Sequence, residues 1–272
     1  MASAPDKAQL GEDAFIRAKL FSSDKSQIRR YADLVVGEEA GYGELFLYEA
    51  TTSLLGGLPG ALGIALRKLF YPRLFRGCGK GVIFGRDLVI RNARNIRLGA
   101  NVVLDDGVVI DGRGAGPEGV VIGDRCIIGR GVMMQAKIGP VHVGADSDIG
   151  SSSVVHSQGG TFIGKEVVIG GGAKISGGVF QIDLGAGEGG QAARAQQRFT
   201  NGPIRIGDRC LIGMGCLFLD GVEVGEGCVV GAGSLVSRSL PAWGVAAGSP
   251  AKVRRMRDGG PVPAPPNQGR MP

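Results

Sequence analysis

The chain has few histidines, few aromatic residues and no apolar run long enough to cross a membrane. Its 272 residues include two His, ten Phe, four Tyr and one Trp. This scarcity of rings, which are not interleaved with the basic residues, argues against nucleic acid as a partner, because a binding platform stacks bases on aromatic side chains. The apolar run 54–66 contains Pro59 and four glycines, so it is too short and too interrupted to span a bilayer. Nothing before Phe15 resembles a signal peptide.

Acidic residues are nearly absent between positions 67 and 97, where Asp87 is the single carboxylate among nine basic residues. Such a cluster is either a solvated face or a contact for an anionic partner, such as a membrane surface or a phosphate-bearing ligand. The segment 54–76 joins an apolar stretch to basic and aromatic residues. It therefore either packs onto the rest of the fold or a neighbouring subunit, or makes peripheral contact with a membrane.

The chain has only five cysteines, and their spacing argues against a metal site or a disulfide framework. Cys126, Cys210, Cys216 and Cys228 all occupy the fifth place of a six-residue repeat described below. Small residues such as Val, Ser and Ala stand there in other repeats, so we expect these thiols to be buried fillers instead of zinc ligands. Free thiols in a core suit a reducing compartment. We therefore expect a cytoplasmic protein, at the inner face of the membrane if segment 54–76 binds lipid.

Glycine, in contrast, is abundant, with 50 residues, and its excess follows a period of six. The stretch 206–236 reads IGDRCL IGMGCL FLDGVE VGEGCV VGAGSL V. A helix would repeat its apolar positions at three and four, and a half-buried strand would repeat them at two. Period six with recurring glycine predicts short strands separated by tight turns, with the leading apolar residue of each six pointing into a common interior.

The repeats are grouped in a way that predicts the shape of the coil. They are visible from Phe84 and regular from Ile122, and each group holds two full sixes and the opening of a third. Extra residues follow the third opening, at 135–142, 156–162 and 176–205. This grouping predicts three faces per turn, hence a triangular prism of parallel strands with insertions leaving from one corner. The long insertion 176–205 is polar, and a loop of this length in a compact repeat is more often functional than decorative.

The segments around the coil have different characters. Residues 1–79 form an N-terminal helical segment in this interpretation, with helices expected over 22–36, 43–55 and 59–71. The coil covers 80–240, a short C-terminal extension covers 241–257, and the Pro/Gly-rich tail 258–272 is expected to be disordered. The fold class is therefore mainly β.

The six-residue repeats, the ending GAGSLVSRSLPAWGVAAGSPAKVRR and the entry GALGIALRKLFYPRLF together resemble the hexapeptide-repeat acyltransferases. The likeness covers about residues 80–257 and is closest to the O-acetyltransferase branch, which modifies sugars and surface polysaccharides. It implies a left-handed parallel β-helix, a homotrimer, acetyl-CoA as acyl donor in the groove between adjacent prisms, and a sugar or glycan acceptor. No metal is implied. A zinc hydratase built on the same prism needs three histidine ligands, and this chain has two.

The resemblance also implies a set of residues on the coenzyme side. Backbone amides beside small residues can approach the pantetheine and the thioester, and basic residues can meet the CoA phosphates. The matching positions are Gly213, Gly215, Gly231, Ala232, Ser234, Gly248, Ser249, Lys252 and Arg254.

The general base departs from the family pattern. Family members carry a histidine just after the third opening of a coil, whereas the matching stretch here, 177–183, reads GGVFQID. The remaining candidates are His156, which follows an opening residue one coil earlier, His142, and Asp183 if it is desolvated. The other interpretation is a catalytically silent trimer that binds a ligand or a partner and serves as a scaffold.

Overall fold

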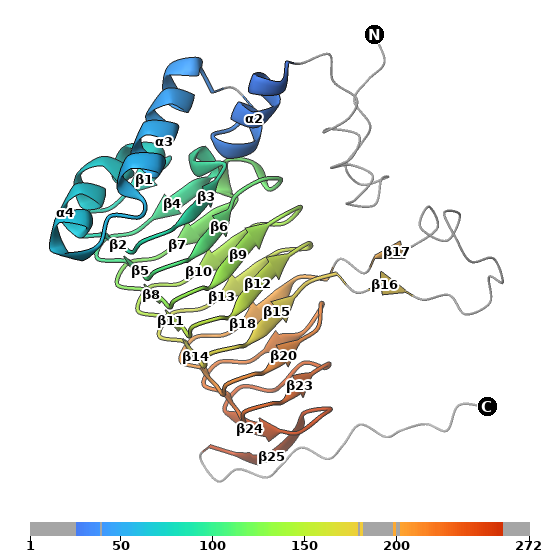
Figure 1. Cartoon of the computed structure of the whole chain (residues 1–272). Coiled ribbons are helices and arrows are strands. Elements are labelled where there is room, and N and C mark those ends of the chain that lie inside the picture. The colour runs from blue at the N-terminus through green and yellow to red at the C-terminus, as the bar shows by residue number, and fades with distance from the viewer. Residues whose placement is uncertain (1–25, 39, 179, 182–197, 200–201, 258–272) are drawn as a thin grey trace.

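The protein is a three-sided parallel β-helix with α-helices packed around its N-terminal end (Figure 1). This computed structural model describes residues 26–38, 40–178, 180–181, 198–199 and 202–257. The predicted mainly β, left-handed parallel β-helix is confirmed. The tail 258–272 and most of the long insertion, including Asp183, lie outside the described residues.

Three parallel sheets form the sides of the prism, and we call them the first, second and third faces. The first face consists of β1 (Gly77–Cys78), β4 (Ile96–Leu98), β7 (Val120–Ile122), β10 (Val141–Val143), β13 (Thr161–Ile163), β18 (Ile204–Ile206) and β21 (Glu223–Val224). The second face consists of β2 (Ile83–Phe84), β5 (Val103–Leu104), β8 (Ile127–Ile128), β11 (Asp148–Ile149), β14 (Val168–Ile169), β19 (Leu211–Ile212), β22 (Val229–Val230), β24 (Gly244–Ala247) and β25 (Lys252–Met256). The third face consists of β3 (Val89–Arg91), β6 (Val109–Asp111), β9 (Met133–Ala136), β12 (Val154–Ser157), β15 (Lys174–Ser176), β20 (Leu217–Phe218) and β23 (Leu235–Val236).

The opening residue of each six fills the interior, as the period predicts. Ile206, Phe218 and Val236 are all at most 2% exposed. Each coil is held to the next by in-register backbone hydrogen bonds, such as Gly213 N–H to the Val230 carbonyl at 2.8 Å. A strand pairs with its equivalent one turn later because the coils stack in register.

The four buried cysteines are fillers, as expected, and they are also hydrogen-bond donors. All four are fully buried free thiols. Each thiol lies near a backbone carbonyl of the next coil or turn, for example Cys210 Sγ to Gly225 O at 3.2 Å and Cys228 Sγ to Pro241 O at 2.8 Å. Ser147 makes the same contact to Gly164 O at 2.9 Å. The fifth place therefore favours small side chains with a weak donor, because a buried carbonyl gains from a partner.

Two edges of the prism bear on function. The edge between the second and third faces is formed by tight turns rich in glycine, including 213–215 and 231–233, and we call it the glycine edge. The edge between the third and first faces carries the insertions and is called the insertion edge. There the chain leaves the coil at 112–119, 137–140, 158–160 and after Ser176. Beyond that point, β16 (Phe180–Gln181) and β17 (Arg198–Phe199) pair in antiparallel fashion.

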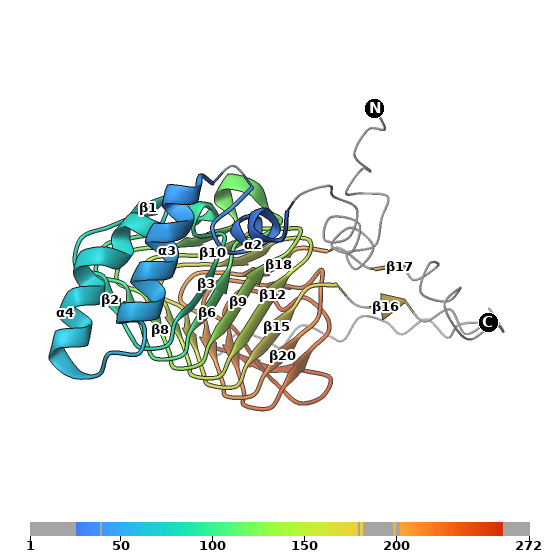
Figure 2. The same ribbon diagram turned by 45° about the horizontal axis from the view of Figure 1, so that its top comes forward.

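Helices precede the first coil and pack around that end of the prism (Figure 2). They are α2 (Gln27–Val35), α3 (Tyr42–Leu55) and α4 (Gly60–Phe70), followed by the short 3-10 helix η1 (Tyr71–Leu74). The three α-helices agree with the segments expected from sequence. Further 3-10 turns, η2 (Ala93–Asn95) and η3 (Gly116–Glu118), lie within the coil. Among the described residues, no helix is long and apolar enough to cross a membrane.

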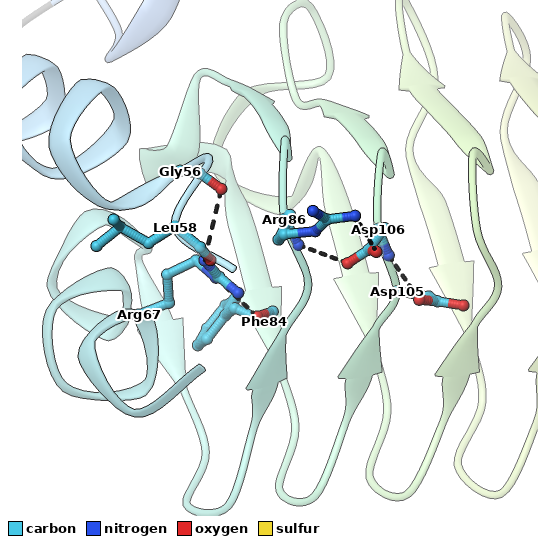
Figure 3. A network of polar contacts seen from close by, with 7 residues as sticks. All are labelled: Gly56, Leu58, Arg67, Phe84, Arg86, Asp105 and Asp106. Atoms are coloured by element: carbon cyan, nitrogen blue, oxygen red, sulfur yellow. Dashed lines mark hydrogen bonds and ion pairs between the residues drawn. The ribbon is translucent and has the colours of Figure 1, made fainter. Parts of the chain in front are cut away.

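Buried Arg67 ties the helices to the coil (Figure 3). Its side chain is 1% exposed. Its Nε donates to the Phe84 carbonyl at 2.9 Å, and its Nη1 donates to the carbonyls of Leu55 at 2.9 Å and Leu58 at 2.8 Å. The cation thus sits at the C-terminal end of α3, where the helix dipole favours positive charge. Arg67 is therefore not part of a solvated or ligand-binding basic cluster.

We expect Arg67→Met to lower the free energy of unfolding by about 3 kcal/mol, because three buried carbonyls lose a charged donor. Urea titration followed by circular dichroism measures the change. Lys68→Met, at the exposed neighbouring position, is the matched control and should change stability by less than about 0.5 kcal/mol. Equal effects of the two substitutions would contradict the anchoring role of Arg67.

Candidate functional site

His156 lies on the outer side of the third face, beside the insertion edge. It is the third residue of β12, whose Val155 and Ser157 point into the core at 0% exposure. In register, His156 lies between Gln135 of β9 and Ser176 of β15. Ser176 is also the last coil residue before the long insertion, so the chain leaves the prism next to this imidazole. The backbone carbonyl of His156 accepts a hydrogen bond from Gly177 N–H at 2.9 Å.

The imidazole of His156 is half-buried and neutral at physiological pH. Burial, with a smaller contribution from the nearby positive charge of Lys137, lowers its pKa to about 4. Its Nε2 is buried and has no hydrogen-bond partner within the described part of the chain. A neutral ring with an unsatisfied nitrogen can accept a proton, or a hydrogen bond donated by a hydroxyl group.

An ion pair between the buried carboxylate of Asp111 and the half-buried side chain of Arg113 lies in the same column of side chains as His156. Asp111 pairs in register with Gln135, which pairs with His156. Arg113 Nε lies 2.8 Å from both carboxylate oxygens of Asp111. The sequence interpretation missed this column, although a signal was present: Asp111, Gln135, His156 and Ser176 each directly follow the third opening residue of their coil.

His142 lies on the other side of the insertion edge. It is the central residue of β10 on the first face, and its ring meets the Phe162 ring edge-on with 5.4 Å between centroids. Its Nε2 is also buried without a partner among the described residues. The Phe162 ring also contacts Arg205, whose guanidinium stacks on it 4.5 Å from the ring centroid. The two histidines therefore flank one edge but belong to different faces.

A shallow cavity of about 280 Å³ lies beside this aromatic array on the first face. Phe162, Arg205, Glu223 and Glu226 line it. Neither His156 nor any of the proposed coenzyme positions contributes to its wall.

The proposed coenzyme positions converge on the glycine edge, at the C-terminal end of the coil. Gly213 and Gly215 belong to the turn between β19 and β20, and Gly231 and Ala232 to the turn between β22 and β23. These turns stack closely, since a Cβ on Gly213 would come within 2.4 Å of the Ala232 backbone nitrogen. Only glycine permits this approach without displacing the next coil.

The last coil extends the same edge. Gly248 and Ser249 follow β24, and the guanidinium of Arg254 lies 3.5 Å from where a Cβ on Gly248 would stand. Lys252 and Arg254 are exposed on β25, which pairs antiparallel with β24. The edge therefore ends in two solvated cations.

Ser234 differs from the other coenzyme positions because it points into the prism. It is 1% exposed, and its hydroxyl donates to Gly231 O at 2.6 Å and accepts from Gly248 N–H at 3.1 Å. The side chain therefore joins two turns of the glycine edge from within and has no free surface for a ligand.

In one chain, the histidine and the glycine edge lie on opposite borders of the third face. Between them, the outer side of this face carries half-buried apolar residues, including Met133, Val154 and Leu217. The described residues contain no group of three or more His, Cys, Asp or Glu side chains that could hold a metal ion. The arrangement offers an apolar floor with an imidazole on one side and close-packed backbone turns on the other.

A family model described as the hexapeptide repeat of succinyl-transferase matches residues 112–136, 140–176 and 203–238. These ranges are the regular coils of the prism. The coils of this chain are therefore similar to the hexapeptide repeat of that family. The similarity rests on the repeats themselves, and the helices and the C-terminal hairpin lie outside the matched ranges.

Individual relatives match only part of this hexapeptide-repeat chain. A 2,3,4,5-tetrahydropyridine-2,6-dicarboxylate N-acetyltransferase of Staphylococcus aureus is 45% identical over 51 residues, which cover 19% of this chain and 21% of the relative. The chain thus matches about a fifth of the length of these curated relatives.

Solved structures match a larger share at lower identity. AntD, an N-acyltransferase from Bacillus cereus in complex with dTDP and 3-hydroxybutyryl-CoA, is 21% identical with a TM-score of 0.48, over 67% of this chain and 84% of that one. A UDP-N-acetylglucosamine acyltransferase from Campylobacter jejuni is 16% identical with a TM-score of 0.43, over 66% of this chain and 71% of that one.

The lowered pKa of His156 predicts a pH-dependent contribution to stability. The unfolded chain takes up a proton near pH 6.5, whereas the folded chain takes it up near pH 4, so the contribution is lost as pH falls between these values. Because the ring is only partly buried, we expect His156→Gln to reduce the loss of stability between pH 7 and pH 5 by about 1 kcal/mol. Chemical denaturation at both pH values measures the difference, with His142→Gln as comparison. An identical pH dependence of wild type and His156→Gln would contradict the burial of a neutral imidazole.

Proposed function

We propose that this protein is a CoA-dependent O-acyltransferase that transfers acetyl from acetyl-CoA to a sugar hydroxyl of a surface polysaccharide or its precursor. It acts in this proposal as a homotrimer, in the cytoplasm, with neighbouring prisms closing the groove over the third face. The observation that carries the proposal is His156, a neutral imidazole with an unpartnered nitrogen, next to the point where the long insertion leaves the coil.

In this proposal the acyl donor and the acceptor bind at opposite borders of the third face. The acyl donor lies along the glycine edge, where Gly213, Gly231 and Gly248 keep the backbone free of side chains and Arg254 faces the CoA phosphates. The acceptor approaches from the insertion edge, and its hydroxyl reaches His156 Nε2 when acceptor binding displaces the residues that bury this nitrogen in the free chain. Ser234 supports the edge from inside and does not contact the donor.

The reaction is a direct transfer with His156 as general base. The imidazole removes the proton of the acceptor hydroxyl while the hydroxyl oxygen attacks the thioester carbonyl carbon. The tetrahedral intermediate then collapses, the carbon–sulfur bond breaks, and the leaving thiolate takes the proton from the imidazolium. The products are the acetyl ester and free CoA thiol, and no redox step is involved. His142 and Asp183 are the alternative bases.

Substitution of His156 tests the base directly. We expect His156→Ala to lower kcat at least about 100-fold, the usual contribution of a general base, with little change in the Kd for CoA. Release of CoA thiol in the presence of a panel of sugar acceptors measures turnover. His142→Ala is the matched control and should retain activity. Unchanged turnover in His156→Ala, or loss in His142→Ala alone, would assign the base elsewhere.

Coenzyme binding separates the enzyme from the alternative, a silent trimeric scaffold, which is motivated by the absence of the expected loop histidine from the stretch 177–183. We expect CoA to bind in calorimetry, and Arg254→Gln to raise its Kd about tenfold, because a charge-assisted contact to phosphate is lost. Arg238→Gln, at an exposed position away from the glycine edge, should leave the Kd unchanged. Absence of binding at millimolar CoA would contradict the proposed enzymatic function and would favour the scaffold function.

A further inference from the structure

The N-terminal end of the prism exposes apolar side chains on α4. Leu62 is 68% exposed and Leu69 is 58% exposed, seven residues apart and therefore on the same side of the helix. Ile64 and Phe70 are also exposed. The buried contacts of α4 are made by its other side, through Gly63 and Arg67. This outer side of α4 has no covering element among the described residues.

Cations are frequent in the sequence around this apolar helix, and the carboxylates near it lie on its coil-facing side, where Asp105 and Asp106 line a cavity with Gly60 and Ile64. The sequence contains no Asp or Glu from Ala50 to Arg86. Four cations of the region are neutralised or at least partly buried: Arg67 in the helix–coil junction, Arg86 by Asp106, Arg94 by Glu44, and Arg91, which is half-buried on β3. The others are exposed and form no ion pair with described residues: Lys68, Arg73, Arg76, Lys80 and Arg97.

We call Leu62, Leu69, Phe70 and these five cations the end surface. Arg73 lies over the Phe70 ring at 5.7 Å and donates to the Leu69 carbonyl at 2.8 Å, so apolar and basic groups interleave. Arg97 joins from the next coil, where it pairs in register with Gly77. The end surface lies at the opposite end of the prism from β24 and β25, which carry the cations of the glycine edge (Figure 1).

We propose that the end surface docks on an anionic lipid bilayer. The apolar side chains of α4 enter the interface between headgroups and acyl chains, and the five cations meet the lipid phosphates. Charge complementarity favours this occupant over a second copy, because the charged residues of the end surface are all cations, so two identical end surfaces would oppose like charges. Docking at this end leaves the third face and the glycine edge accessible. The proposal does not depend on the acyltransferase assignment.

Vesicle binding tests the proposal with the full chain. We expect flotation with vesicles of phosphatidylcholine and phosphatidylglycerol, little with phosphatidylcholine alone, and weaker binding as NaCl is raised. Lys68→Gln/Lys80→Gln should weaken binding roughly 25-fold, since each cation near an anionic surface contributes about fivefold. Lys165→Gln/Lys174→Gln removes the same charge from exposed positions elsewhere and should have no effect.

A second pair of variants tests the contribution of the apolar side chains of α4 to vesicle binding. Leu62→Gln should weaken vesicle binding, whereas Met214→Gln, which is 67% exposed at the far end of the prism, should not. Equal binding to neutral and anionic vesicles, or equal loss in the control pairs, would overturn the proposal. A change of oligomer mass in light scattering on Leu62→Gln/Leu69→Gln, with vesicle binding unchanged, would assign the surface to a second copy and also overturn it.

Discussion

The hydrogen-bond register between successive coils is the constraint on which the structure depends. Each strand is only two to five residues long, so no strand is stable alone and each is fixed by the equivalent strand one turn away. A residue's place in the six therefore decides its environment. Opening residues and fifth-place residues fill the interior, while the residue after an opening faces outward. His156 and Ser234 both take their positions from this rule.

The same rule explains how a regular coil can carry a specific site. His156 is outward because Val155 before it opens a six, and it is unusual because the insertion begins one coil later at Ser176. The glycine edge is smooth because close stacking excludes a Cβ at Gly213. The third face lies between these two borders. A thioester placed along one border and a hydroxyl approaching the other can meet over its apolar floor.

Much of this fold could be predicted from the sequence because it is repetitive. The period of six, the three faces, the corner that carries the insertions and the in-register cysteines all follow from local patterns that tertiary packing reinforces. The helices could also be predicted from the sequence, since Ser26 caps α2 through its side chain and Pro59 precedes α4. The environments of single polar residues could not be predicted from the sequence. Arg67 looks like its basic neighbours in sequence, and only the structure shows that backbone carbonyls surround it.

The candidate site could be predicted only in part for the same reason. The glycine positions follow the repeat, but the inward direction of Ser234 depends on its being a fifth-place residue with two backbone partners. The depressed pKa of His156 depends on burial and on Lys137, which approaches from the preceding coil.

A crystal structure of the protein with bound CoA tests the account most directly. The account predicts pantetheine along turns 213–215 and 231–233, with phosphates near Arg254. CoA bound instead in the cavity beside Phe162 and Arg205 on the first face would contradict it.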